Sequence, residues 1–124
     1  MNKNSKIYIA GHNGLVGSAI FRQLKKRGYK KIITRSRNKL DLTNQNKVFN
    51  FLEKTKPDMI FLAAAKVGGI ATNNKLRAEF IYENLCMQNN IIHAAFRNKI
   101  NNLIFLGSSC VYPRNCKQPI KEKY

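Results

Sequence analysis

Acidic residues are few in this sequence: its 124 residues include 6 Asp plus Glu against 23 Lys plus Arg, a formal net charge of +17. Tryptophan is absent, and the longest uninterrupted apolar run covers residues 59–65, far short of the roughly 20 residues that a membrane span needs. No secretory signal peptide is expected, because His12 and Asn13 interrupt the apolar stretch that follows Lys6. We therefore expect a cytoplasmic chain that does not enter a membrane.

Cysteine is also scarce and lacks the spacing of a disulfide framework or a zinc site. Cys86, Cys110 and Cys116 are odd in number and form no Cys-x-x-Cys pair. His12 and His93 have no partner at metal-ligand spacing. We expect a reducing environment and no metal centre.

The excess of positive charge raises the alternative of a basic nucleic-acid-binding module. The basic residues are spread over turns and expected helix ends, without aromatic interleaving or a helix-turn-helix pattern. This distribution favours a solvated basic surface without a specific nucleic-acid partner. A salt titration separates the two, because phosphate-driven binding to nucleic acid weakens steeply with salt.

Apolar spacing and turn residues predict alternating strands and helices. Strands are expected at 6–10, 31–34, 59–65 and 102–106, helices at 14–27, 44–54 and 75–98, and a loop at 66–74. The core stripe of the last helix is expected to contain Phe80, Ile81, Leu85, Ile91, Ile92, Ala95 and Phe96.

This alternation predicts an α/β fold with parallel strands joined by helical crossovers. We expect the N-terminal half of a doubly wound Rossmann sheet, with strand order 3-2-1-4 and helices on both faces. A partial NAD(P)-binding domain would cover residues 1–112 and a polar tail residues 113–124.

A glycine-rich turn separates the first expected strand from the first helix. It consists of Gly11, His12, Asn13, Gly14, Leu15, Val16 and Gly17. In a βαβ context such glycines permit a tight turn, close approach of a pyrophosphate and packing of the helix on the sheet. Dinucleotide binding is favoured, and an ordinary strand–helix turn is the alternative.

The segment after the second strand indicates which dinucleotide would fit. It contains Arg35 and Arg37 but no acidic residue before Asp41. Guanidinium groups suit a 2′-phosphate, whereas an acidic residue would suit the free ribose of NAD. NADP is therefore favoured over a merely basic surface turn, and Asp41 and Leu42 are candidates for contact with the adenine.

With the glycine turn, three further segments carry a family resemblance: AAAKVGGI at 63–70, NIIHAA at 90–95 and FLGSSCVYP at 105–113. The chain resembles the extended short-chain dehydrogenase/reductase family, and within it the GDP-L-fucose synthases, from about residue 6 to 122. Another nucleotide-sugar epimerase or dehydratase of the same superfamily is the alternative.

The resemblance implies an NADPH-dependent enzyme, homodimeric when complete, that epimerises GDP-4-keto-6-deoxy-D-mannose at C3 and C5 and reduces it at C4. It implies that Gly11–Gly17 hold the pyrophosphate and that Arg37 faces the 2′-phosphate. Leu106, Gly107, Ser108 and Ser109 would line the nicotinamide end. Ser108 would be the catalytic serine and Cys110 the base in epimerisation.

The chain departs from the family pattern at two places. Asn13 stands where the family often has a second arginine in the glycine turn. The Tyr-x-x-x-Lys pair expected after the serine segment is absent. The sequence therefore predicts the N-terminal part of such an enzyme, without catalytic activity by itself.

Overall fold

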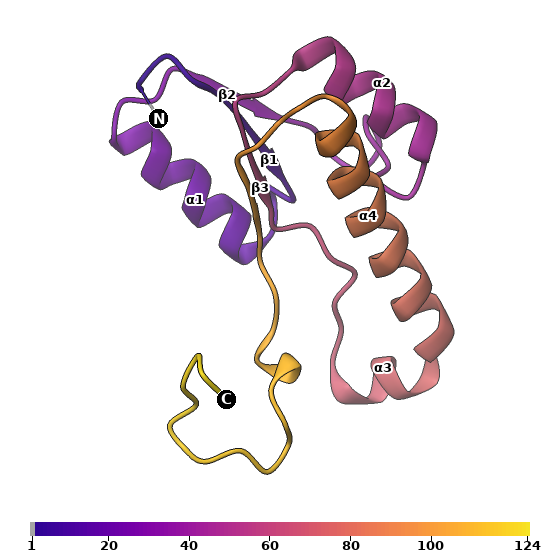
Figure 1. Ribbon diagram of the computed structural model, residues 1–124. Coiled ribbons are helices and arrows are strands. Elements are labelled where there is room, and N and C mark those ends of the chain that lie inside the picture. The colour runs from indigo at the N-terminus through magenta and orange to yellow at the C-terminus, as the bar shows by residue number, and fades with distance from the viewer. Residues whose placement is uncertain (1) are drawn as a thin grey trace.

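A computed structural model describes residues 2–124; Met1, the first residue of the predicted domain 1–112, lies outside the described residues. Strands and helices alternate along the chain from β1 to β3, and two successive helices, α3 and α4, then precede β4 (Figure 1). The elements are β1 (Lys6–Ala10), α1 (Leu15–Lys26), β2 (Lys31–Thr34), α2 (Gln45–Thr55), β3 (Met59–Leu62), α3 (Ile70–Lys75), α4 (Arg77–Arg97), β4 (Leu103–Phe105) and the 3₁₀ turn η1 (Ser109–Val111).

The four strands form one parallel sheet in the order β2-β1-β3-β4. The parallel, doubly wound architecture is confirmed, but the predicted order 3-2-1-4 is wrong, because β3 lies beside β1 and not beside β2. The reason is burial: β1 and β3 are apolar on both faces and take the centre. Strand β2 begins with exposed Lys31, has no fully buried residue, and takes an edge.

Helices cover both faces of the sheet, as predicted (Figure 1). On one face Leu24 of α1 packs with Ile7, Ile9 and Met59. On the other, α2 and α4 cover the alternate residues of the central strands. That core contains Tyr8, Ala10, Ile60, Leu62, Val48, Leu52, Ile91, Ala94 and Ala95. The period-2 alternation of side chains along β1 and β3 divides the two cores.

The long helix α4 differs from its predicted core stripe. Phe80, Ile91 and Ala95 are buried, whereas Ile81, Leu85, Ile92 and Phe96 are exposed. The buried residues of α4 pack against α2 and the central strands, and no other element among residues 2–124 covers the side that carries Ile81, Leu85, Ile92 and Phe96. An apolar stripe on α4 therefore faces solvent.

Two local predictions also need correction. Residues 66–74 were expected to be a loop, but α3 occupies Ile70–Lys75. The third strand ends at Leu62, three residues earlier than expected. The Ala63 N–H still donates to the Ala10 carbonyl of β1 at 2.9 Å, and residues 64–69 then form the loop toward α3. Among residues 2–124, no helix is both long and apolar enough to cross a lipid bilayer.

Candidate functional site

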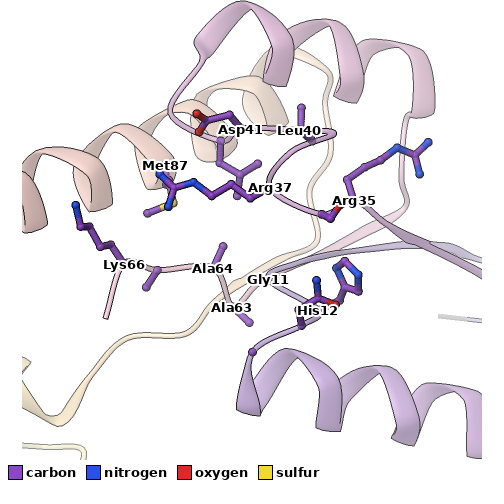
Figure 2. A pocket seen from close by; sticks show the side chains of 15 residues that line it. Gly11, His12, Arg35, Arg37, Leu40, Asp41, Ala63, Ala64, Lys66 and Met87 are labelled. Carbon is purple, nitrogen blue, oxygen red and sulfur yellow. The ribbon is translucent and has the colours of Figure 1, made fainter. Parts of the chain in front are cut away.

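The candidate site lies where the chain changes direction across the sheet. Helix α1 leads from β1 to the edge strand β2, and α2 leads back past β1 to β3 on the opposite face. The helices that follow β1 and β3 therefore lie on opposite faces of the sheet, an arrangement that leaves a crevice at the carboxyl ends of the strands. A cavity of about 230 Å³ lies there, lined by the segments that follow β1, β2 and β3 and by Met87 of α4 (Figure 2).

The turn after β1 is closed tightly against the loop after β3. Gly11 has φ +85°, in the left-handed region that glycine tolerates. A Cβ on Gly11 would lie 2.6 Å from the Ala64 nitrogen, and one on Gly17 would lie 2.7 Å from the Gly11 carbonyl carbon. Two of the three glycines are thus required by backbone contact, and the turn is more than an ordinary glycine-rich connection.

Gly14 has a different environment from the other two glycines. Its φ of −76° is open to any residue, and an added Cβ would meet only the Gly11 oxygen, at 3.4 Å. Gly14 is the N-cap of α1, makes no side-chain cap, and is followed by a first turn without acidic residues. The free N–H groups of that turn carry the positive end of the helix dipole and suit an anion such as a pyrophosphate.

The segment after β2 presents two arginines that point in opposite directions (Figure 2). Arg35 lies over the Phe51 ring, 5.4 Å from its centroid, and donates to the Thr34 carbonyl at 2.8 Å. Arg37 extends across the cavity toward α4, where its Nη2 donates to Glu83 at 3.1 Å. Arg37 is therefore the guanidinium available to a ligand in the cavity.

Asp41 lines the cavity but is committed to the backbone that follows it. Its Oδ1 accepts from the Thr43 N–H at 3.0 Å and from the Thr43 hydroxyl at 2.8 Å. The backbone hydrogen bond from Thr43 is the main cause that holds the pKa of Asp41 below its usual value. Asp41 closes a turn after Leu40, and Leu40 and Leu42 add apolar wall.

A buried asparagine ties this wall to α4. Asn90 is 7% exposed, and its Nδ2 donates to the carbonyls of Leu42 at 2.9 Å and Thr43 at 3.1 Å. The amide meets backbone groups that no strand partner satisfies, so the segment is fixed by one side chain.

The loop after β3 is held by two adjacent residues of α4. The Asn84 side chain accepts from the Lys66 N–H at 2.7 Å and donates to the Lys66 carbonyl at 3.0 Å. Glu83 accepts from the Lys66 ammonium, and this hydrogen bond is the main cause that lowers the pKa of Glu83. Lys66 is thereby fixed at the wall of the cavity.

Two residues of the serine segment (residues 105–113) line a neighbouring hollow, and none lines the first cavity. Ser108 and Cys110 lie there with Lys66, Phe80 and Asn84. The Ser108 hydroxyl accepts from the Cys110 N–H at 3.3 Å and caps η1. Lys66 lines both hollows, so the predicted cofactor residues of the first cavity lie next to the predicted catalytic residues Ser108 and Cys110.

The cavity brings together seven of the fifteen predicted site residues. It is lined by Gly11, His12, Asn13, Gly14, Arg37, Asp41 and Leu42. Leu15 and Val16 are exposed at 89% and 50% and do not line it, while Gly17 packs beneath the turn. Leu106, Gly107 and Ser109 lie outside the residues that line either hollow.

Sequence reasoning did not assign site roles to Lys66, Glu83, Asn84 or Met87. The AAAKVGGI segment marked the region of Lys66. Nothing in the sequence marked the α4 residues, because their position facing the loops depends on how α4 packs on the sheet.

The residues present fit a phosphorylated dinucleotide. The cradle at Gly11 and Gly17 has no room for a side chain, the α1 N-terminus is open, and Arg37 reaches the wall. The Asp41 carboxylate already accepts two hydrogen bonds from Thr43. Ala63, Ala64, Leu40 and Met87 add the apolar lining that an adenine ring needs.

Known proteins share both this sequence and this fold. The chain is 50% identical over 117 residues to GDP-L-fucose synthase of Escherichia coli, covering 94% of this chain and 36% of that protein. A GDP-mannoheptose C4 reductase from Campylobacter jejuni, solved with NADP bound, is 48% identical with a TM-score of 0.94 and covers 100% of this chain and 39% of that one. A GDP-L-fucose synthetase from Naegleria fowleri bound to NADP is 27% identical with a TM-score of 0.85, covering 99% of this chain and 36% of that one.

The chain spans a little over a third of the length of these relatives. A family model also matches almost all of it, residues 7–124. The matched residues include the glycine turn, Arg37, the AAAKVGGI loop and the serine segment. The chain belongs to the NAD dependent epimerase/dehydratase family.

Proposed function

We propose that this chain is the cofactor-binding part of an NADPH-dependent enzyme that reduces a 4-keto GDP-sugar. The observation that carries the proposal is Arg37, which lines the same cavity as the uncapped N-terminus of α1 at Gly14. Relatives that are 48% and 27% identical were solved with NADP bound, which supports the same cofactor here.

The residues of the chain would divide the cofactor between them. The turn Gly11–Gly14 and the first N–H groups of α1 would bind the pyrophosphate. Arg37 would pair with the 2′-phosphate, and Leu40, Leu42 and Met87 would contact the adenine. When bound, the reduced nicotinamide supplies hydride to a carbonyl carbon.

For the whole protein we propose the substrate GDP-4-keto-6-deoxy-D-mannose, with epimerisation at C3 and C5 and reduction at C4. Ser108 would hydrogen-bond the ketone oxygen and Cys110 would remove a proton next to the ketone. We further propose that residues 1–112 form the cofactor unit and 113–124 a polar tail, that the whole protein is a cytoplasmic homodimer, and that this chain by itself does not turn over substrate. The GDP-L-fucose synthases at about 50% identity support this substrate class.

We expect Arg37→Ala to weaken NADPH binding by roughly 10- to 100-fold, the loss of affinity expected when one hydrogen-bonded charge pair is removed. Binding of NADH, which has no 2′-phosphate, should stay unchanged. Isothermal titration calorimetry on the purified chain measures both affinities. Arg114→Ala removes the same charge from the exposed tail and is the matched control. Equal affinity of the unmodified chain for NADPH and NADH would contradict the proposal.

We expect Cys110→Ser, in a chain extended to the length of its relatives, to slow proton exchange at C3 and C5 far more than hydride transfer. A cysteine can accept a proton as its thiolate, whereas the hydroxyl of serine does not ionise in this way. Deuterium incorporation from solvent, followed beside NADPH oxidation, separates the two steps. Unchanged incorporation would show that Cys110, an exposed residue of η1, does not remove the proton.

A further inference from the structure

Acidic residues are rare in this protein, and one of them, Glu83 of α4, lies between two cations from two different loops. Its Oε2 accepts from Nη2 of Arg37 at 3.1 Å, and its Oε1 accepts from Nζ of Lys66. These two contacts are the ion pairs found among residues 2–124. A single carboxylate thus connects the segment after β2 with the loop after β3.

The two cations are held very differently. The Lys66 side chain is 24% exposed, and its backbone is paired in both directions with Asn84. The Arg37 side chain is 74% exposed, and the hydrogen bond to Glu83 is its single side-chain hydrogen bond in the described structure. Packing therefore cannot fix the guanidinium of Arg37, and Glu83 is the group that does so.

The geometry leaves Arg37 able to bind a ligand while it contacts Glu83. Only Nη2 donates to the carboxylate, so Nε and Nη1 keep free N–H groups for an anion. The negative charge of Glu83 is compensated by Lys66, and the three side chains together carry one positive charge. Glu83 therefore orients the guanidinium without making the local charge negative.

We propose that Glu83 is a positioning residue that holds Arg37 in place for the 2′-phosphate of the adenosine and thereby sets the preference for phosphorylated over unphosphorylated ligand. The inference rests on the proposed NADP(H) site. Without Glu83, the long arginine side chain must lose its rotamer freedom at the moment of binding, which costs affinity.

The test compares 2′,5′-ADP with 5′-AMP, which differ by the 2′-phosphate alone, using calorimetry on the whole chain. Glu83→Gln should weaken the binding of 2′,5′-ADP roughly three- to tenfold, because the long Arg37 side chain is no longer ordered before the ligand binds. The affinity for 5′-AMP should stay unchanged. Glu79→Gln removes the same charge one turn earlier on α4, from an exposed side chain with no ion pair among the described residues, and should change neither affinity.

A double-mutant cycle separates positioning from a general structural role. In an Arg37→Ala background, Glu83→Gln should no longer change the ratio of the two affinities. Tighter binding of 2′,5′-ADP in Glu83→Gln, or equal weakening of both ligands, would overturn the inference while leaving the NADP(H) proposal in place. An unmodified chain with no preference for 2′,5′-ADP would overturn the proposed function and this inference together.

Discussion

Gly17→Ala is expected to destabilise the chain by at least about 2 kcal/mol, because overpacking against a backbone that cannot move away is costly. A Cβ at this position would overlap the Gly11 carbonyl oxygen and lie 3.0 Å from the His12 Cα. These are backbone atoms of the tight turn, so no side chain can rotate to make room. The gain in helix propensity from glycine to alanine, roughly 1 kcal/mol, does not compensate. Binding of NADPH should be lost at the same time, because the turn must open.

Urea unfolding followed by circular dichroism measures the change in free energy of unfolding. Gly69→Ala is the matched control, because an added Cβ meets nothing within 4 Å and φ is −68°. Gly14→Ala completes the comparison. It should leave the free energy of unfolding nearly unchanged, because an added Cβ meets only the Gly11 oxygen at 3.4 Å. It should weaken NADPH binding, because the Cβ would stand where the pyrophosphate approaches the turn. Equal stability of the Gly17 and Gly69 variants would show that the turn relaxes easily.

Asn90→Asp is expected to cost roughly 3–5 kcal/mol at neutral pH, the usual result of an uncompensated buried charge. The Asn90 amide donates to the carbonyls of Leu42 and Thr43. A carboxylate in its place has no proton to donate and would face two carbonyl oxygens in a site that is 7% exposed. Burial beside two carbonyl oxygens should therefore raise the pKa of the new carboxyl group in the folded state above its value in the unfolded state.

The pH dependence gives the sign of this effect. A folded pKa above the unfolded value means that the folded state binds the extra proton, so the variant is most stable below about pH 4. Its stability should then fall as the pH rises toward the raised folded pKa. Urea unfolding at pH 4 and at pH 7 measures the difference relative to the unmodified chain.

Asn89→Asp is the matched control for this variant, because Asn89 is the exposed neighbour on the same helix. It should show no comparable loss of stability at pH 7. Asn90→Leu keeps the size of the side chain and removes only the hydrogen bonds, at about 1–3 kcal/mol. An Asn90→Asp variant as stable at pH 7 as at pH 4 would mean that the carboxylate reaches water.

The elements nearest the site could be predicted from local sequence. Strands β1 and β2 match the predicted ranges, and α1 and α2 differ from theirs by a residue at each end. Local signals suffice there because apolar residues, glycines and capping residues act within a few positions of each other. The left-handed Gly11 and the uncapped N-terminus of α1 follow from the same short segment.

The exposed stripe of α4 shows where local reasoning stops. Phe80, Ile91 and Ala95 are buried, but Ile81, Ile92 and Phe96 are not. Helical periodicity identifies an apolar side, and it does not say how much of that side another element covers. Coverage depends on which elements pack on α4 in the folded chain, here α2 and the central strands.

The sequence by itself determined the alternation of strands and helices, the glycine turn and the basic segment with Arg37, because each depends on residues close together in the chain. The tertiary structure alone decided that β3 lies beside β1, which opens the crevice at that point. It also decided that Glu83 lies between Arg37 and Lys66, 46 and 17 positions away. Contacts over such separations depend on how α4 packs across the sheet, and no pattern within a single segment encodes them.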